Sequence, residues 1–260
     1  MYPDRASGPV DTPKDHPRYS SLMVRERLAE FMMKGLVTPT GLISHGRGEA
    51  FDYLMNESTT RAAEEAERAA VAYLLNAKNP VICVNGNAAA LDAQRIIELS
   101  SETDSKIEVN IFHRTEERME ALIKYMESCG AKNVLGRHPD SRIPGLSSNR
   151  ALCTDEGIYS SDVILVPIED GDRAEALVNM GKTVISVDLN PLSRTSRAAT
   201  VSISDELSRA LSNMIRFAKE LKDDEYERKR IISKFSNADN RKETMVQICK
   251  NLRSAAEDRR

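Results

Sequence analysis

The sequence predicts an α/β protein, built on a parallel sheet with helices on both faces and extended by helices at its N-terminal and C-terminal ends. Four short apolar runs lie in the middle of the chain: VICV at 81–84, IEVNIF at 107–112, VILVPI at 163–168 and TVISVD at 183–188. Such runs are typical of strands buried on both faces. Helical patterns separate them, and parallel neighbours need such long, right-handed connections. The 260 residues, 40% hydrophobic and 30% charged, have the composition of a globular protein.

The N-terminal part is expected to be a flexible start followed by a helical segment. Residues 1–17 contain four prolines and little apolar material, which predicts a flexible lead-in. The helical segment is expected to span 18–78. Its first helix, at 18–35, ends at Gly35, and its second is an alanine-rich helix at 59–76.

Between these two helices the motif HGRGEA places Arg47 between Gly46 and Gly48. Two glycines beside a charged side chain serve no obvious packing purpose. We therefore expect a loop that lets Arg47 and its backbone approach an anion together. The alternative is a tight turn that carries charge, followed by a helix that begins near Glu49.

Residues 79–221 are expected to form the Rossmann-like sheet domain. Between and after its strands, the spacing of apolar residues predicts helices, in chain order, at 91–102, 115–130, 173–180 and 205–221. The region 135–161 breaks this alternation and is too long for an ordinary connector.

The C-terminal stretch 222–260 is highly charged, and we expect a helical tail there. Apolar residues recur near helical spacing at Met245, Ile248, Cys249 and Leu252. This stripe predicts that the tail packs on another part of the protein.

The charge and the cysteines restrict the class of protein. A formal net charge of −3, from 37 basic and 40 acidic residues, argues against a general nucleic-acid binder. The four cysteines are scattered without a CxxC pair, which is typical of reduced thiols in a cytoplasmic protein. No apolar run approaches the ~20 residues that span a bilayer, so no membrane partner is expected.

Polar residues follow the carboxyl end of every predicted strand. These ends lie at one edge of a parallel sheet, which is where α/β proteins bind their ligands. In chain order, these residues are Asn85-Gly86-Asn87, His113-Arg114, the run from Glu169 to Arg173, and the run from Asp188 to Arg194. This combination of arginines with Asn-Gly turns favours an anion site.

Several of these signals have an ordinary structural interpretation as well. VNGNAAAL lacks the third glycine of a dinucleotide fingerprint, and Gly181-Lys182-Thr183 precedes a strand where a phosphate-binding loop would open a helix. EDGDR is either turn chemistry at a helix start or a group of carboxylates that holds Mg²⁺ or an ammonium group. His113 is either a general base or a hydrogen-bonded structural residue.

Seven strings, occurring together in one order, resemble one family. They are HPRYSSLMVRE, GLISHGRGEAFDYL, VICVNGNAAAL, FHRTEER, RIPGL, VILVPIEDGDRAEALVNMGK and VDLNPLSR. In this order they resemble the archaeal phosphopantothenate synthetases, also called 4-phosphopantoate–β-alanine ligases, over about residues 15 to 220. The resemblance implies a Rossmann-like homodimer that works in coenzyme A biosynthesis. It would use ATP to join 4-phosphopantoate to β-alanine and release AMP and pyrophosphate.

The resemblance also implies which residues bind the nucleotide. Arg25 in SLMVRE and Arg47 in HGRGEA are expected beside it, with Arg47 at the phosphates. The remaining expected contacts are Asp188, Leu189, Asn190, Arg194, Thr195, Glu206 and Leu207.

The reaction of such a ligase requires side chains that stabilise charge, accept a proton and bind the substrates. Attack of the carboxylate on the ATP α-phosphorus gives an acyl-adenylate, and Mg²⁺ and arginines stabilise the charge that develops. β-Alanine must then lose a proton, for which we expect Asp170 or Asp172, with His113 as a further candidate. Asn85 and Asn87 are expected to orient substrate oxygens, and His113 and Arg114 to bind the phosphate of 4-phosphopantoate. Two alternatives remain on the same fold: an NAD(P)-dependent oxidoreductase and a non-catalytic nucleotide sensor.

Overall fold

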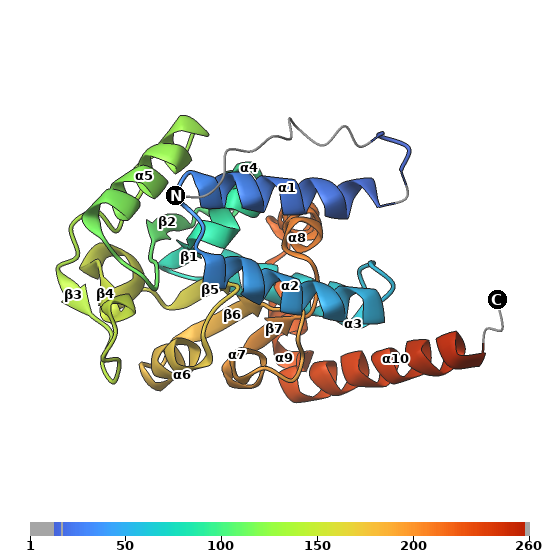
Figure 1. Cartoon of the computed structure of the whole chain (residues 1–260). Helices are drawn as coiled ribbons and strands as arrows, with labels where there is room; N and C mark the ends of the chain where they lie inside the picture. Colours follow the sequence, from blue (N-terminus) through green and yellow to red (C-terminus); the bar gives the residue numbers. More distant parts are fainter. Residues whose placement is uncertain (1–12, 17, 258–260) are drawn as a thin grey trace.

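The computed structural model describes residues 13–16 and 18–257. In this part of the chain a five-stranded parallel sheet carries helices on both faces, which confirms the predicted class (Figure 1). The strands are β1 (Pro80–Val84), β2 (Lys106–Val109), β5 (Val163–Pro167), β6 (Thr183–Val187) and β7 (Val201–Ile203). Their order is β2-β1-β5-β6-β7. Along the chain, β2 is added on one side of β1, and β5, β6 and β7 are then added in turn on the other side, so the strand order reverses between β1 and β5. Ligands of open α/β sheets bind at such a reversal.

The helices surround this sheet. Before it come α1 (Tyr19–Met33), α2 (Pro39–Leu54) and α3 (Arg61–Asn76). Along the described chain, four helices connect its strands: α4 (Gly86–Thr103), α5 (Glu116–Ser128), α6 (Gly171–Asn179) and α7 (Arg194–Ala198). Three described helices follow the last strand: α8 (Leu207–Leu221), α9 (Glu225–Lys234) and α10 (Asn237–Glu257). The region 135–161 folds as a small unit with β3 (Ser141–Arg142), β4 (Leu152–Cys153) and the short turns Asn149–Ala151 and Asp155–Tyr159.

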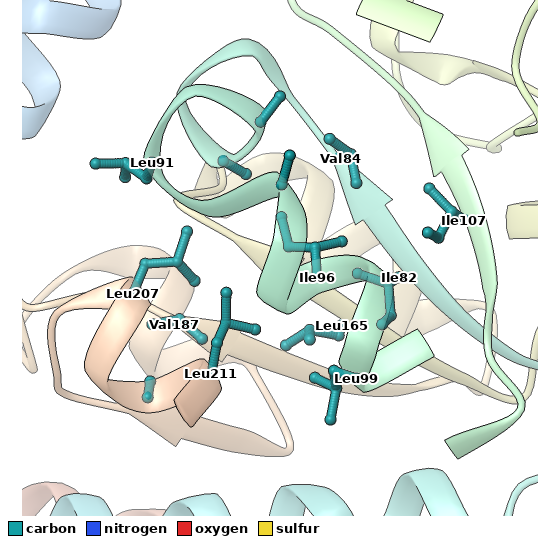
Figure 2. Packing of buried hydrophobic residues seen from close by; sticks show 14 of the residues in the cluster. Ile82, Val84, Leu91, Ile96, Leu99, Ile107, Leu165, Val187, Leu207 and Leu211 are labelled. Atoms are coloured by element: carbon teal, nitrogen blue, oxygen red, sulfur yellow. The ribbon is translucent and has the colours of Figure 1, made fainter. Parts of the chain in front are cut away.

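Alternation along the strands creates a core on each side of the sheet. Ile82 and Val84 of β1 belong to the larger core, in which side chains of α4 and α8 pack on the sheet (Figure 2). Val81 and Cys83 point the other way, into a smaller core that contains Leu177 of α6. The strands are therefore buried on both faces, as their apolar sequences predict.

Side-chain caps begin several helices. The hydroxyl of Thr60 accepts a hydrogen bond from the N–H of Ala63 at the start of α3, and Thr115 does the same for Arg118 at α5. Asn85 caps α4 through the N–H of Ala88. Such caps satisfy amides that have no partner within the helix. The cap at Asn85 thus begins a helix immediately after β1, at the ligand-binding edge of the sheet.

The structure corrects the expected loop at HGRGEA. The segment lies inside helix α2, which begins at Pro39 after the capping residue Thr38 and continues to Leu54. Pro at the first helical position and a Thr cap are strong start signals, and they outweigh the cost of the glycines. The backbone around Arg47 is therefore helical, and only its side chain is free to approach a ligand.

Two other differences concern short elements. The second strand ends at Val109, and the side chain of the next residue, Asn110, donates to the carbonyl of Leu152 (2.9 Å). Strand β7 was not expected, because it has only three residues and is too short for a periodic pattern.

The C-terminal tail is helical, but the expected apolar stripe is wrong in part. Asn240, Thr244 and Ile248 are the buried residues of α10, spaced four apart, whereas Cys249 is exposed and Leu252 is 51% exposed. The amide of Asn240 donates to the carbonyl of Ala62 at the start of α3 (2.7 Å). The amide of Asn251 donates to the carbonyl of Leu54 at the end of α2 (2.8 Å), and the C-terminal end of α10 projects from the body of the protein (Figure 1). The expected lead-in, 1–17, lies outside the described residues apart from 13–16.

Candidate active site

Two adjoining cavities lie at the carboxyl edge of the sheet, where the strand order reverses. The smaller, of about 310 Å³, is lined by the residues that follow β1 and β2. The larger, of about 630 Å³, is lined by the residues that follow β6 and by the start of α8. Helix α2 borders both. Their common wall consists of Ser44, Arg47, Ile168 and Asp170. The predicted gathering of polar strand ends is thus present.

The larger cavity brings together most of the residues predicted to bind a nucleotide. Its lining includes Arg47, Asp188, Leu189, Asn190, Arg194, Thr195, Glu206 and Leu207. Asp188 accepts hydrogen bonds from the N–H of Asn190 (2.9 Å) and the hydroxyl of Ser193 (2.5 Å). Burial raises the pKa of Asp188, although these bonds and the charge of Arg47 oppose the rise. A cation beside Asp188 would therefore be stabilised.

A glycine brings two walls of this cavity close together. A Cβ atom at Gly171, the first residue of α6, would lie 2.3 Å from Cβ of Arg194 at the start of α7. Only glycine permits this approach. Thr195 closes the contact, because its hydroxyl donates to the carbonyl of Glu169 (2.7 Å).

The charge of Arg47 is free for a ligand. In the described part of the chain, Arg47 forms no hydrogen bond or ion pair. Arg194 is 60% exposed and pairs with Glu175 (2.8 Å) at the rim of the larger cavity. A guanidinium without a partner, on the wall between two cavities, is suited to anionic groups from either side.

The smaller cavity contains His113 and both predicted asparagines, but the asparagines also have structural roles. Asn85 donates to the carbonyls of Pro167 (2.9 Å) and Ile168 (3.1 Å), and thereby joins the ends of β1 and β5. Asn87 donates to the carbonyl of Gly41 in α2 (2.9 Å).

Arg118 is a cation of the smaller cavity that the sequence analysis did not identify. Its guanidinium donates to the carbonyls of Gly35 (3.1 Å), Leu36 (3.1 Å) and His113 (2.5 Å), and none of these partners is charged. Burial lowers the pKa of Arg118 without removing its charge. Arg118 is thus held rigidly, with a positive charge that an anionic ligand can neutralise.

Three predicted residues do not line either cavity. Arg25 pairs with Glu49 on α2 (2.7 Å) and donates to the hydroxyl of Tyr53 (2.9 Å). Arg114 donates to the carbonyl of Gly136 (2.8 Å) and so supports the region 135–161.

The third, Asp172, is exposed on the first turn of α6, where it accepts a hydrogen bond from the N–H of Arg173 (2.9 Å). Of the two carboxylates predicted to receive a proton, Asp170 is thus the one at the common wall.

Arg150 is a second residue that the sequence analysis missed. It comes from the short turn Asn149–Ala151, lines the smaller cavity and donates to the carboxylate of Asp170 (2.8 Å). Its segment, 135–161, lacks a regular sequence pattern, so the one available signal was that this connector is too long to be ordinary.

Comparison with known proteins shows the family of this chain. A family described as phosphopantothenate/pantothenate synthetase matches residues 62–251. A 4-phosphopantoate–β-alanine ligase of Methanosarcina mazei is 50% identical over 248 residues, which are 95% of this chain and 98% of that protein. Ligases of the same name are 52% identical in Methanospirillum hungatei (82% of this chain, 87% of that protein) and 47% identical in Thermococcus kodakarensis (96% of each). These matches are to a synthetase family and not to a family of oxidoreductases. The chain therefore belongs to the phosphopantothenate/pantothenate synthetase family.

Proposed function

We propose that this chain is an ATP-dependent ligase that condenses 4-phosphopantoate with β-alanine to 4'-phosphopantothenate, in coenzyme A biosynthesis. One observation supports this most directly: two adjoining cavities share a wall that carries a free cation, Arg47, and a carboxylate, Asp170. A ligase needs a nucleotide and an organic acid side by side, with their reacting groups at the boundary. Relatives that match nearly the whole chain are named for this reaction.

The first half-reaction takes place at Arg47. In our proposal ATP occupies the larger cavity and 4-phosphopantoate the smaller one. The carboxylate of 4-phosphopantoate attacks the α-phosphorus, pyrophosphate leaves, and an acyl-adenylate forms. Arg47 faces both cavities, so its guanidinium can stabilise negative charge on the transferred phosphorus. Arg118 and His113, on the smaller cavity, would bind the phosphate of 4-phosphopantoate.

The second half-reaction takes place at Asp170. The ammonium group of β-alanine loses a proton to the Asp170 carboxylate. The amine then attacks the acyl carbon, its nitrogen releases a second proton to water, and AMP leaves with the electrons of the acyl carbon–oxygen bond. Oδ2 of Asp170 is bound to Arg150, whereas Oδ1 has no hydrogen bond among the described residues. Oδ1 is therefore the proposed proton acceptor.

Mg²⁺ fits the donor set of the larger cavity. Among the described residues no group of three His, Cys, Asp or Glu side chains could hold a metal by itself. Mg²⁺ that accompanies a nucleotide needs one or two carboxylates and takes its other ligands from phosphates and water. Asp188, whose pKa is raised by burial, is the carboxylate we assign to it. The ion would neutralise charge on the phosphates.

We also propose that the enzyme is a cytoplasmic homodimer. None of the described helices is long and apolar enough to cross a bilayer. Helices α1 and α2 lie along one side of the molecule (Figure 1), and Met33, Ile43 and Tyr53 on them are 54%, 65% and 42% exposed. Contact with a second copy would cover these side chains. Light scattering after size-exclusion chromatography tests the dimer, and a mass near the 29.0 kDa of one chain would exclude it.

A substrate-omission series tests the function. AMP and pyrophosphate are measured after incubation with ATP and Mg²⁺, with 4-phosphopantoate, with β-alanine, with both, and with unphosphorylated pantoate in place of its phosphate ester. We expect AMP to accumulate when 4-phosphopantoate and β-alanine are both present. Nucleotide binding without AMP in any mixture would instead indicate a nucleotide sensor. In a separate assay with a nicotinamide cofactor, a change in the absorbance of that cofactor would indicate an oxidoreductase.

A further inference from the structure

A chain of buried charges lies behind Asp170. Arg150 joins two carboxylates: it donates to Asp170 through Nη1 (2.8 Å) and to Glu169 through Nη2 (2.8 Å). Arg173 binds Glu169 from the other side. The side chains of Glu169 and Arg173 are each 1% exposed, whereas that of Asp170 is 52% exposed at the cavity wall. The chain of charges therefore runs from the core to the proposed proton acceptor.

Stability does not account for this arrangement. Removing ions from water costs several kcal/mol for each ion, and apolar residues of similar size are often at least as stabilising. Among the described residues, Nε and Nη2 of Arg173 and Nε of Arg150 are buried without a hydrogen-bond partner. Buried donors without partners are a further cost. A costly network next to a reactive site suggests a role in positioning.

The charges of the network also favour the contact between Arg150 and Asp170. In the buried part of the network, Arg150 and Arg173 face the single carboxylate of Glu169. The excess positive charge lies on the guanidinium that reaches the cavity, where the carboxylate of Asp170 neutralises it. Asp170 is thereby held by one oxygen, and its second oxygen stays available.

The backbone next to Asp170 is fixed as well. Ile168 has φ +51°, a left-handed conformation that is unfavourable for a β-branched residue. Asn85 donates to the carbonyls on both sides of this strain, those of Pro167 and Ile168. Strained residues persist where the surroundings determine their conformation, and they cluster at active sites. The turn from β5 to α6 is therefore rigid before any substrate binds.

We propose that Glu169 and Arg173 are positioning residues for the ligation. They hold Arg150 so that its Nη1 fixes Oδ2 of Asp170 and leaves Oδ1 to receive the proton of the amine. This inference rests on the proposed function, in which Asp170 takes that proton. Neither Glu169 nor Arg173 contacts the reacting atoms, so both act through Asp170.

A double-mutant cycle tests the inference with two assays. ATP–pyrophosphate exchange with 4-phosphopantoate reports the first half-reaction, and AMP release with β-alanine reports both. Asp170→Asn is expected to lower kcat for ligation about 10²-fold. Glu169→Gln is expected to lower it about tenfold, with exchange changed less than about threefold. The double variant is expected to be no slower than Asp170→Asn, because residues that act as a unit are non-additive.

Controls separate positioning from folding. Leu177→Ala removes apolar packing from the same helix α6 without touching the charges, so it should lower the melting temperature and leave kcat unchanged. Arg173→Lys, which keeps the charge, provides a milder second variant and is expected to retain part of the activity.

The outcomes are distinguishable. Multiplicative effects of the Glu169 and Asp170 variants, or exchange that falls in parallel with ligation, would overturn the positioning role. A fully active Asp170→Asn variant would overturn it too, while the ligase function would stand. A wild-type enzyme that releases no AMP with both substrates would overturn the function itself.

Discussion

Arg47 has a charge that no described carboxylate neutralises by direct contact. It lies on α2, at the wall shared by the two cavities that we assign to the nucleotide and to 4-phosphopantoate. An unpaired cation at the surface of a cavity is poorly explained by stability, because water solvates it as well in the unfolded chain. An anionic ligand explains it better. A guanidinium also binds two phosphate oxygens through two parallel hydrogen bonds, which an ammonium group cannot do.

Arg47→Ala is therefore expected to lower kcat/KM for ligation about 10²-fold or more, without loss of stability. Arg47→Lys should also be poor, because a point charge does not reproduce a bidentate contact. AMP release and thermal unfolding measure the two properties, with Arg61→Ala as the control, since Arg61 is an exposed arginine of α3 that pairs with Glu65. Normal kinetics of the lysine variant would show that no bidentate contact is needed. Normal kinetics of the alanine variant would show that Arg47 has no role in the reaction.

At the scale of elements, the sequence predicted the strands and the gathering of their ends, because apolar runs and crossover helices follow from burial. It did not predict which arginine after β2 reaches the cavity. Arg114 lies before α5 and Arg118 lies in its first turn, and the choice between them depends on how α5 packs on the rest of the protein. That contact involves the carbonyls of Gly35 and Leu36, far away in the sequence.

Helix α2 shows why a motif can suggest the wrong local structure. Glycine inside a helix costs about 0.5–1 kcal/mol relative to alanine, so HGRGEA reads as a loop. The cap at Thr38 and the tertiary contacts of the helix override this preference. One of these contacts is the hydrogen bond that the amide of Asn87 donates to the carbonyl of Gly41 in α2 (2.9 Å).

A pair of glycine substitutions tests the helical assignment. Gly46→Ala is expected to raise the free energy of unfolding by about 0.5–1 kcal/mol, because its Cβ would meet nothing within 4 Å. Gly41→Ala, in the same helix, should destabilise the fold, since its Cβ would lie 2.6 Å from Oδ1 of Asn87. Urea denaturation measures both variants. If Gly46→Ala proved destabilising, the segment would not be helical in solution.

At the scale of the whole molecule, the walls of the site come from distant parts of the chain, and buried polar groups join them. Asp205, at the larger cavity, accepts hydrogen bonds from Thr59 before α3 (2.6 Å) and from Arg209 of α8 (2.9 Å). Arg209 also donates to Asp52 of α2 (3.2 Å). One network therefore connects α2 and α8, which line the larger cavity, with the segment that precedes α3.

Glu67 of α3 lies fully buried against this network, and its environment opposes ionisation. Burial and, next in size, the charge of Asp205 raise the pKa of Glu67 to about 9 from a usual value of 4.5. In the unfolded chain the same carboxyl ionises near its usual pKa. Between these two pH values the folded state binds a proton that the unfolded state has lost. The free energy of unfolding therefore carries no penalty from Glu67 below pH 4.5. Between pH 4.5 and about 9 it falls by about 1.4 kcal/mol per pH unit.

Glu67→Gln should remove this pH dependence, because an amide is neutral in both states. The variant is expected to match wild type near pH 4.5 and to exceed its free energy of unfolding by about 3 kcal/mol at pH 7. Denaturation at pH 5, 7 and 8.5 measures the difference, with Glu64→Gln as the control, since Glu64 is half-exposed on the same helix and pairs with Arg216. Parallel stability curves for wild type and Glu67→Gln would mean that Glu67 is ionised in the fold. The network between α2, α8 and the segment that precedes α3 would then have to contain a cation or water molecules that compensate its charge.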